Sequence, residues 1–128
     1  MKEPRWITID TLHLLHHRQI ELFGGADGIR DVGAIESALA RPLNAFAYGE
    51  ATDIKTLAAC YLCGLSRQPG YLDGNKRTAL GAMLVFLALN GRKLVVPAAE
   101  LYGVVIAAAT SEADVTQVAA WVKKFTAP

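Results

Sequence analysis

Residues 71–80 read Tyr-Leu-Asp-Gly-Asn-Lys-Arg-Thr-Ala-Leu, and this stretch joins a polar turn to the start of an apolar segment. Over residues 78–89 the apolar side chains recur at helical spacing, and Asn90-Gly91 then ends the pattern. The polar residues 73–77 are therefore expected at the N-terminus of a helix. Backbone N–H groups without helical partners and the positive end of the helix dipole meet at such an end.

The residue types of this turn suit an anion together with a metal ion. Gly74 lets the backbone approach an anion closely, while Lys76 and Arg77 add a point charge and a planar fork of donors. Asp73 is a natural ligand for a divalent cation that accompanies a nucleotide. The alternative is that Asp73 only caps the helix and that the two cations form a solvated basic turn.

Read with its surroundings, the turn resembles the core motif of the Fic/Doc superfamily, and most closely that of its Doc (death-on-curing) toxin branch. That motif reads His-x-Phe-x-Asp-Ala/Gly-Asn-Lys-Arg; Tyr71 stands at the Phe position, and residues 73–77 match the rest. The likeness extends along nearly the whole chain, at Leu15-His16, Phe23-Gly24-Gly25, Gly28-Ile29-Arg30-Asp31, Glu36-Ser37-Ala38-Leu39, Arg41-Pro42, Tyr48-Gly49-Glu50 and Leu87-Ala88-Leu89-Asn90-Gly91.

One position departs from the motif. The histidine that opens it would fall at residue 69, where this chain has Pro69, followed by Gly70. Proline has no titratable group, so it cannot take a proton from an attacking hydroxyl, which is the role the family gives to that histidine. Loss of a general base typically costs a factor of roughly 100 to 10,000 in rate. Electrostatic binding of a nucleotide does not need the base.

The resemblance implies a transfer from ATP to a protein hydroxyl. In that reading Asp73 holds Mg²⁺, and the turn formed by Gly74, Asn75, Lys76 and Arg77 cradles the phosphates. Most of the superfamily transfers a nucleotidyl group, whereas the Doc branch resembles a kinase that phosphorylates a threonine of elongation factor Tu and stops translation. Because Pro69 replaces the base, we expect activity to be weak or lost, and whether the chain is an enzyme stays open.

The resemblance also bears on partners. Many superfamily members carry a self-inhibitory helix in which a glutamate precedes Gly or Asn, and no glutamate of this chain does so. Inhibition is therefore expected from a cognate antitoxin acting in trans. Three readings remain: an impaired Doc-like toxin of a toxin-antitoxin pair, a pseudoenzyme that binds nucleotide or a protein partner without transfer, and a regulatory subunit of a toxin-antitoxin complex.

The three histidines all fall on the first predicted helix. His16 shares a buried stripe with Ile9, Leu12, Ile20 and Phe23, and a histidine on an apolar face is more often a satisfied core residue than a base. Its use in place of the missing base is the less favoured alternative. His13 and His17 are one turn apart and could hold a metal on spacing alone, but no third ligand is evident.

Composition limits the remaining function classes. The chain has 128 residues, 52% of them hydrophobic, and is expected to form a single domain over residues 1–128. Its 13 basic and 12 acidic residues give a net charge of +1, so neither direct nucleic-acid binding nor membrane binding is expected. The longest apolar run, 79–89, is too short to span a bilayer, and the first residues lack a secretory pattern. We expect a cytoplasmic protein in which Cys60 and Cys63 are reduced core residues.

Helical periodicity predicts six helices, at residues 8–23, 31–40, 53–67, 75–90, 98–110 and 112–125. The expected end signals are Asp31 and Asp53 as N-caps, Gly24-Gly25 and Gly91 as stops, and a variant capping box at residues 111–114. The helix at 75–90 is apolar nearly all round, which marks it as central.

Residues 42–50 join two predicted helices and alternate polar and apolar side chains, which allows a short extended flap. The resemblance implies that target peptides dock along such a flap by strand addition. The alternative is an ordinary connection with Phe46 and Tyr48 packed into the core. Residues 92–97 are expected to be a connector. The predicted fold is all-α: a compact Fic/Doc-type bundle of about six helices around a central apolar helix, with room for a flap strand or hairpin.

Overall fold

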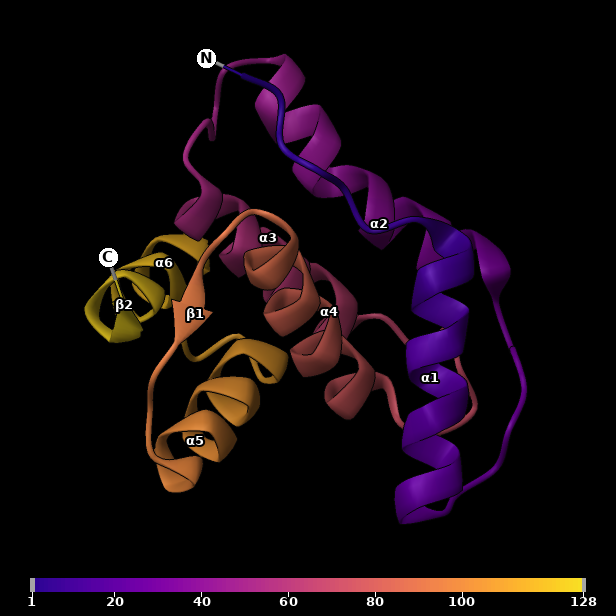
Figure 1. The fold of residues 1–128 in the computed structure, drawn as a ribbon. Helices are drawn as coiled ribbons and strands as arrows, with labels where there is room; N and C mark the ends of the chain where they lie inside the picture. The colour runs from indigo at the N-terminus through magenta and orange to yellow at the C-terminus, as the bar shows by residue number, and fades with distance from the viewer. Residues whose placement is uncertain (1, 128) are drawn as a thin grey trace.

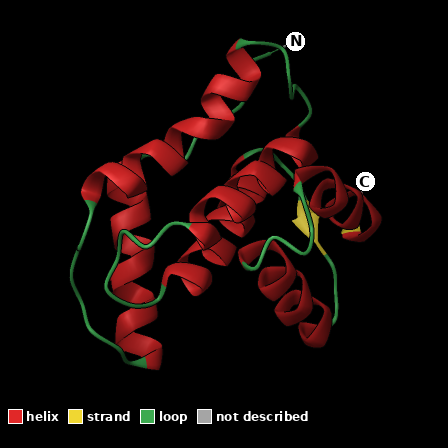
Figure 2. Cartoon of the chain, turned by 180° about the vertical axis from the view of Figure 1, so that it is seen from behind, coloured by secondary structure: helices red, strands yellow, loops and turns green. Residues whose placement is uncertain are grey.

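A computed structural model describes residues 2–127, and within them the protein is a bundle of six helices with one very small sheet (Figure 1). The helices are α1 (Ile9–Phe23), α2 (Val32–Ala47), α3 (Ile54–Arg67), α4 (Asn75–Leu89), α5 (Ala98–Ala109) and α6 (Val115–Phe125). Two strands of two residues each, β1 (Lys93–Leu94) and β2 (Thr126–Ala127), pair antiparallel. Figure 2 shows from behind how little of the chain this pair occupies. The predicted all-α class is confirmed.

The helix starts follow the capping chemistry read from the sequence. Asp31 and Asp53 each accept a hydrogen bond from the backbone N–H three residues later, at 3.1 Å in both cases. Both predicted N-caps are confirmed. At the other end of α1, Gly24 adopts a positive φ of 80°, where glycine has no steric penalty. The predicted stop after Phe23 is therefore confirmed as well.

The second helix is longer than predicted, and the extended flap at residues 42–50 was wrong. Residues 42–47 continue α2, with Pro42 inside the helix. Proline has no N–H to donate to the carbonyl of Ala38. Helix α3 packs close to that carbonyl at Gly64, since a Cβ added to Gly64 would lie 3.5 Å from the carbonyl oxygen. Tertiary packing thus holds the helix where local propensity would end it. Residues 48–53 form the short connection to α3.

Aromatic packing explains why the last turn of α2 stays on the bundle. Trp6 packs against Phe46 of α2 and Phe86 of α4, with ring centroids 5.7 and 5.9 Å away. Phe46 therefore packs against the core, as the alternative prediction for residues 42–50 stated. Tyr48 does not, since 79% of its surface is exposed.

The C-terminal segments differ from the prediction in two places. Helix α6 begins at Val115 rather than at residue 112, because the capping box is formed by Asp114 and Gln117. Ser111, placed in the box by sequence, instead adopts a left-handed backbone with φ of 64°. The connector at residues 92–97 contains β1. This strand pairs with β2 and so joins the segment after α4 to the segment after α6.

The core is built around α3 and α4 together. Helix α3 packs against α2, α4, α5 and α6, and α4 packs against α1, α3 and α5. Helix α4 is central, as expected from its apolar sequence, and shares that place with α3. Figure 1 shows α1 along one side of α4, with α5 and α6 on the opposite side of the bundle. Within residues 2–127, no helix is both long and apolar enough to cross a bilayer.

The loop between α3 and α4 is tied to the loop before α2. The carbonyl of Gly70 accepts hydrogen bonds from the N–H groups of Arg30 and Asp31, at 2.7 and 3.0 Å. The Leu72 N–H donates to the Gly28 carbonyl at 3.1 Å, and Tyr71 and Ile29 form an isolated bridge. These bonds fix the approach of the chain to the N-terminus of α4.

We predict that Gly70→Ala lowers the free energy of unfolding by about 1–3 kcal/mol, because an added methyl group would overpack this contact. A Cβ at this position would meet the Ile35 side chain and lie 2.7 Å from the backbone oxygen of Asp31, which cannot rotate away. Urea unfolding followed by circular dichroism measures the loss. Gly103→Ala is the matched control, since nothing lies within 4 Å of the added atom. Equal stability of the two variants would contradict the packing argument.

Candidate functional site

The N-terminus of α4 is open. Its N-cap is Gly74, in the left-handed region with φ of 82°, and no side chain caps the helix. The first backbone bond joins the Thr78 N–H to the Gly74 carbonyl at 2.9 Å. Within residues 2–127, the N–H groups of residues 75–77 have no hydrogen-bond acceptor. The end of the helix therefore keeps the unpaired donors and positive dipole that attract anions.

Asp73 does not cap α4, so that alternative for its role is excluded. Its Oδ2 instead accepts a hydrogen bond from the Ala26 N–H at 2.7 Å, and its backbone carbonyl lies 2.8 Å from Nε2 of His16. Close approach of the loop requires Gly25, because a Cβ there would lie 3.1 Å from Cβ of Asp73. Oδ1 receives no hydrogen bond from residues 2–127, so the exposed carboxylate keeps one oxygen for a ligand.

Asn75 is held by the protein itself. Its Oδ1 accepts hydrogen bonds from the Tyr71 N–H and from Nε2 of Gln68, both at 3.1 Å. Its Nδ2 donates to the Tyr71 carbonyl at 3.0 Å. The side chain thus closes the turn before α4, and only its backbone N–H faces the open end of the helix. The sequence analysis predicted that Asn75 contacts the phosphates, and it missed the hydrogen bonds by which this side chain holds the turn.

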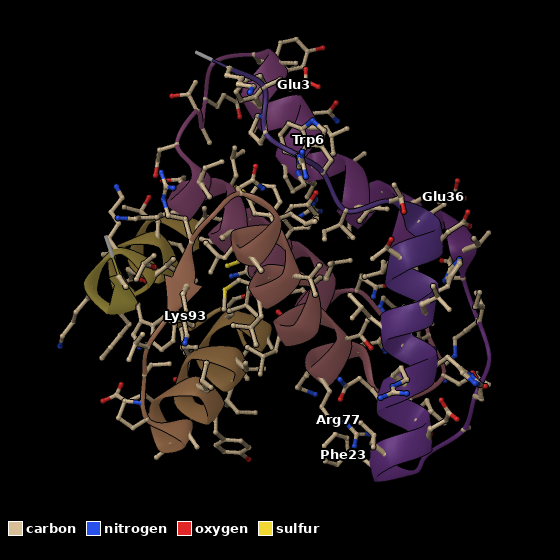
Figure 3. All side chains as sticks on the ribbon, in the orientation of Figure 1. Glu3, Trp6, Phe23, Glu36, Arg77 and Lys93 are labelled. Atoms are coloured by element: carbon tan, nitrogen blue, oxygen red, sulfur yellow. The ribbon has the colours of Figure 1, made fainter. Side chains whose placement is uncertain are left out.

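Two cations stand beside the open helix end. Among residues 2–127, neither Lys76 nor Arg77 has a carboxylate within 4.0 Å. The Arg77 guanidinium lies 5.1 Å from the ring centroid of Phe23, and its Nη2 donates a long 3.4 Å hydrogen bond to Gly24. Figure 3 shows Arg77 and Phe23 next to each other at the end of α1. Within the described part of the chain, the positive charges of Lys76 and Arg77 are therefore not neutralised by an acidic side chain.

The turn borders a cavity of about 1010 Å³, large enough for a nucleotide. Residues 72–77 line one side, and Leu101, Tyr102 and Val105 of α5 line another. The side chain of Tyr102 is 73% exposed and offers an aromatic face to a ligand. The contribution of α5 could not be read from the sequence, because only the packing of distant helices brings it opposite the motif.

The histidines occupy three different environments. His16 is buried, as predicted, and contacts Asp73, whereas Nδ1 of His13 lies 2.7 Å from the hydroxyl of Tyr71. His17 is exposed and pairs with Asp27 at 2.9 Å. No group of three or more His, Cys, Asp or Glu residues within 2–127 is arranged to hold a metal ion by itself. A metal at Asp73 would therefore need oxygens from its ligand or from water.

Burial keeps Tyr71 and the two cysteines of the chain in their neutral forms. It raises the pKa of Tyr71 above its ordinary value, so the hydroxyl stays neutral beside His13. Cys60 and Cys63 are free thiols, and burial raises the pKa of Cys60 to about 11 and also raises that of Cys63. Both cysteines are therefore neutral thiols near pH 7, which disfavours metal binding and nucleophilic chemistry.

Comparison with known proteins identifies the family of this chain. The sequence model of the Fic/DOC family matches residues 6–87, which include α1 to α3 and nearly all of α4. The chain belongs to the Fic/DOC family. It is 38% identical over 115 residues to "Protein kinase doc" of Escherichia phage P1, covering 90% of each chain. It is 42% identical over 74 residues to "Toxin Doc" of Mycolicibacterium smegmatis, covering 56% of each chain.

Within the Fic/DOC motif, the position of the missing histidine is an exposed loop residue. Pro69 follows the end of α3, and its neighbour Gln68 bridges the loop, accepting from the Gly70 N–H at 2.6 Å and donating to Asn75. Pro69 itself makes none of the side-chain hydrogen bonds that hold the turn. The turn therefore keeps its shape without a histidine at this position.

We predict that Asn75→Ala lowers the free energy of unfolding by about 1–3 kcal/mol, because it leaves the N–H of buried Tyr71 without an acceptor. Lys76→Ala, one residue away on the exposed surface, is expected to stay within about 0.5 kcal/mol of the wild-type protein. Thermal and urea unfolding of the three proteins measure both effects. An unchanged stability for Asn75→Ala would show that its bonds to Tyr71 do not hold the turn.

Proposed function

We propose that this protein is a Doc-like toxin of a toxin-antitoxin pair that binds Mg²⁺ and ATP at the N-terminus of α4. The observation that carries the proposal is the open helix end, where unpaired N–H groups and the cations Lys76 and Arg77 border a cavity beside Asp73. Four features of a triphosphate site thus converge on one turn: amide donors, positive charge, a carboxylate oxygen and space.

The described residues fit the ligand that the family implies. Gly74 has the left-handed backbone that brings the chain close to an anion, and the free Oδ1 of Asp73 suits a hard divalent cation. Bound Mg²⁺ would neutralise charge that develops on the transferring phosphate. Lys76 and Arg77 would do the same from the protein side, without any change in the fold.

The reaction we propose is phosphoryl transfer from ATP to a protein hydroxyl, with elongation factor Tu as the target by resemblance to the Doc branch. A bond forms between the hydroxyl oxygen and the terminal phosphorus, the bond from that phosphorus to ADP breaks, and the hydroxyl proton passes to solvent water. Positioning and charge stabilisation supply most of the rate in such transfers. Because Pro69 cannot accept the proton, we infer that transfer is slow or absent.

We infer that His16 does not replace the base. Its Nε2 lies 2.8 Å from the carbonyl oxygen of Asp73, an acceptor that has no proton to give, so Nε2 carries the proton. The free lone pair is then on Nδ1, which lies 3.9 Å from Oδ1 of Asp27. The ring is also buried, whereas the motif turn borders the cavity. If transfer proves absent, the same site would serve as a nucleotide-binding pseudoenzyme, which is the second function we propose.

A cognate antitoxin is part of the proposal, because two relatives bear the names of Doc proteins and one is named a toxin. The rim of the site offers a surface for such a partner. Phe23 is 64% exposed, and Leu72 and Tyr102 are also exposed, at the edge of a cavity lined by the cations Lys76 and Arg77 together with Asp73. A segment that combines apolar and acidic side chains would complement it. A partner and target of this kind would place the protein in the cytoplasm.

Restoring the motif histidine tests the catalytic part of the proposal. We predict that Pro69→His raises the rate of phosphate transfer from γ-labelled ATP to purified elongation factor Tu by roughly 100-fold or more. Pro69→Asn is the matched control, since it removes proline without adding a base. Asp73→Asn in the restored protein should abolish transfer because it weakens the metal ligand.

Calorimetric titration with ATP and Mg²⁺ separates the remaining outcomes. Binding by the wild-type protein with transfer only after restoration would identify a nucleotide-binding pseudoenzyme. Transfer by the wild-type protein at a rate near that of Pro69→His would show that residue 69 is not needed. No binding and no transfer by either protein would reject the nucleotide site and favour a regulatory subunit.

A further inference from the structure

His16 connects α1 to the motif turn from inside the core. It comes from the middle of α1, only 3% of its surface is exposed, and its Nε2 lies 2.8 Å from the backbone oxygen of Asp73. This bond links residues 57 positions apart in the sequence. It is the contact by which α1 reaches the peptide group immediately before the N-cap of α4.

The orientation of the His16 ring is fixed by its neighbours. The ring stacks on that of Tyr71, with centroids 3.7 Å apart and planes inclined by 9°. Tyr71 is itself held, since its hydroxyl lies 2.7 Å from Nδ1 of His13 and its backbone is bonded to Asn75. The stack therefore sets the plane of the ring, and the hydrogen bond to Asp73 sets the direction of Nε2–H within that plane.

Asp73 is thereby fixed at two points. Its carbonyl receives the bond from His16, and its Oδ2 receives the bond from the Ala26 N–H on the loop that follows α1. With the carbonyl and one carboxylate oxygen both engaged, the direction of Oδ1 is restricted. A ligand oxygen held in advance loses less entropy on binding a cation, and residues that orient such ligands tune metal affinity.

From this geometry we propose that His16 is the positioning residue of Asp73: its Nε2–H holds the peptide group whose carboxylate receives Mg²⁺. The inference rests on the proposed function, in which Asp73 is the metal ligand. His16 touches neither metal nor nucleotide in this role and takes no part in proton transfer. It acts through the orientation of one carboxylate.

The test compares His16→Gln with His16→Met. Both side chains are unbranched and of similar length, and both lose the aromatic stack, but only glutamine keeps an N–H donor near the position of Nε2. We expect His16→Met to weaken Mg²⁺-dependent ATP binding about tenfold, as loss of a group that orients a metal ligand typically does. His16→Gln should retain most of the wild-type affinity. ATP binding without Mg²⁺ should change little in either variant.

A second measurement reports on Asp73 without any ligand. The amide proton of Ala26, hydrogen bonded to the carboxylate at 2.7 Å, gives an NMR signal that is sensitive to the position of that carboxylate. We expect this signal to move in His16→Met and to stay near its wild-type position in His16→Gln. Thermal unfolding of both variants confirms that the comparison is made on folded protein.

The outcomes distinguish this inference from the proposed function. Equal Mg²⁺-dependent affinity in the two variants, with the Ala26 signal also equal, would overturn the positioning role. If the wild-type protein binds neither Mg²⁺ nor ATP, the proposed function fails. The positioning role of His16 is then tested by the NMR signal of the Ala26 amide alone. A signal displaced only in His16→Met would then still establish that His16 positions Asp73, whereas an unmoved signal would reject it.

Discussion

The structure depends on how the short connection between α3 and α4 is held. Its Gly70 carbonyl is bonded to the loop before α2, and its polar turn is closed by Asn75. Because these contacts lie behind the turn, the first N–H groups of α4 remain free in front of it. An anion site of this kind needs backbone donors that the protein itself does not use. The packing of α1, α2 and α3 around the connection provides that condition.

Local chemistry made much of this fold predictable. The caps at Asp31 and Asp53, the stop at Gly24 and the apolar surface of α4 each act over a few residues, and each was found as predicted. The flap failed for the opposite reason. Pro42 and the alternating residues after it favour an extended chain locally, but packing of α2 on α3 and of Phe46 on Trp6 favours a helix. Contacts between segments distant in sequence cannot be predicted from the residue pattern of a short stretch of chain.

The candidate site shows the same division. Sequence alone placed residues 73–77 at a helix N-terminus, because the change from a polar turn to an apolar helix lies within one stretch of chain. It could not separate Asn75, whose side chain closes the turn, from Lys76 and Arg77, whose charges have no acidic partner among residues 2–127. The sequence also could not predict that α5 lines the cavity, because this depends on how helices far apart in the sequence pack together. Periodicity placed His16 in the core but could not give it a partner.

The residues that hold the motif turn are separate from residue 69. The groups that shape the turn are Gly70, Asn75, Gln68 and His16, and none of them relies on residue 69. A base contributes to one proton transfer, whereas helix dipole, amides and cations act on the phosphate charge as long as the turn is folded. In the proposed function, Pro69 at the base position therefore slows or prevents transfer, while the electrostatic field of the helix end does not depend on residue 69.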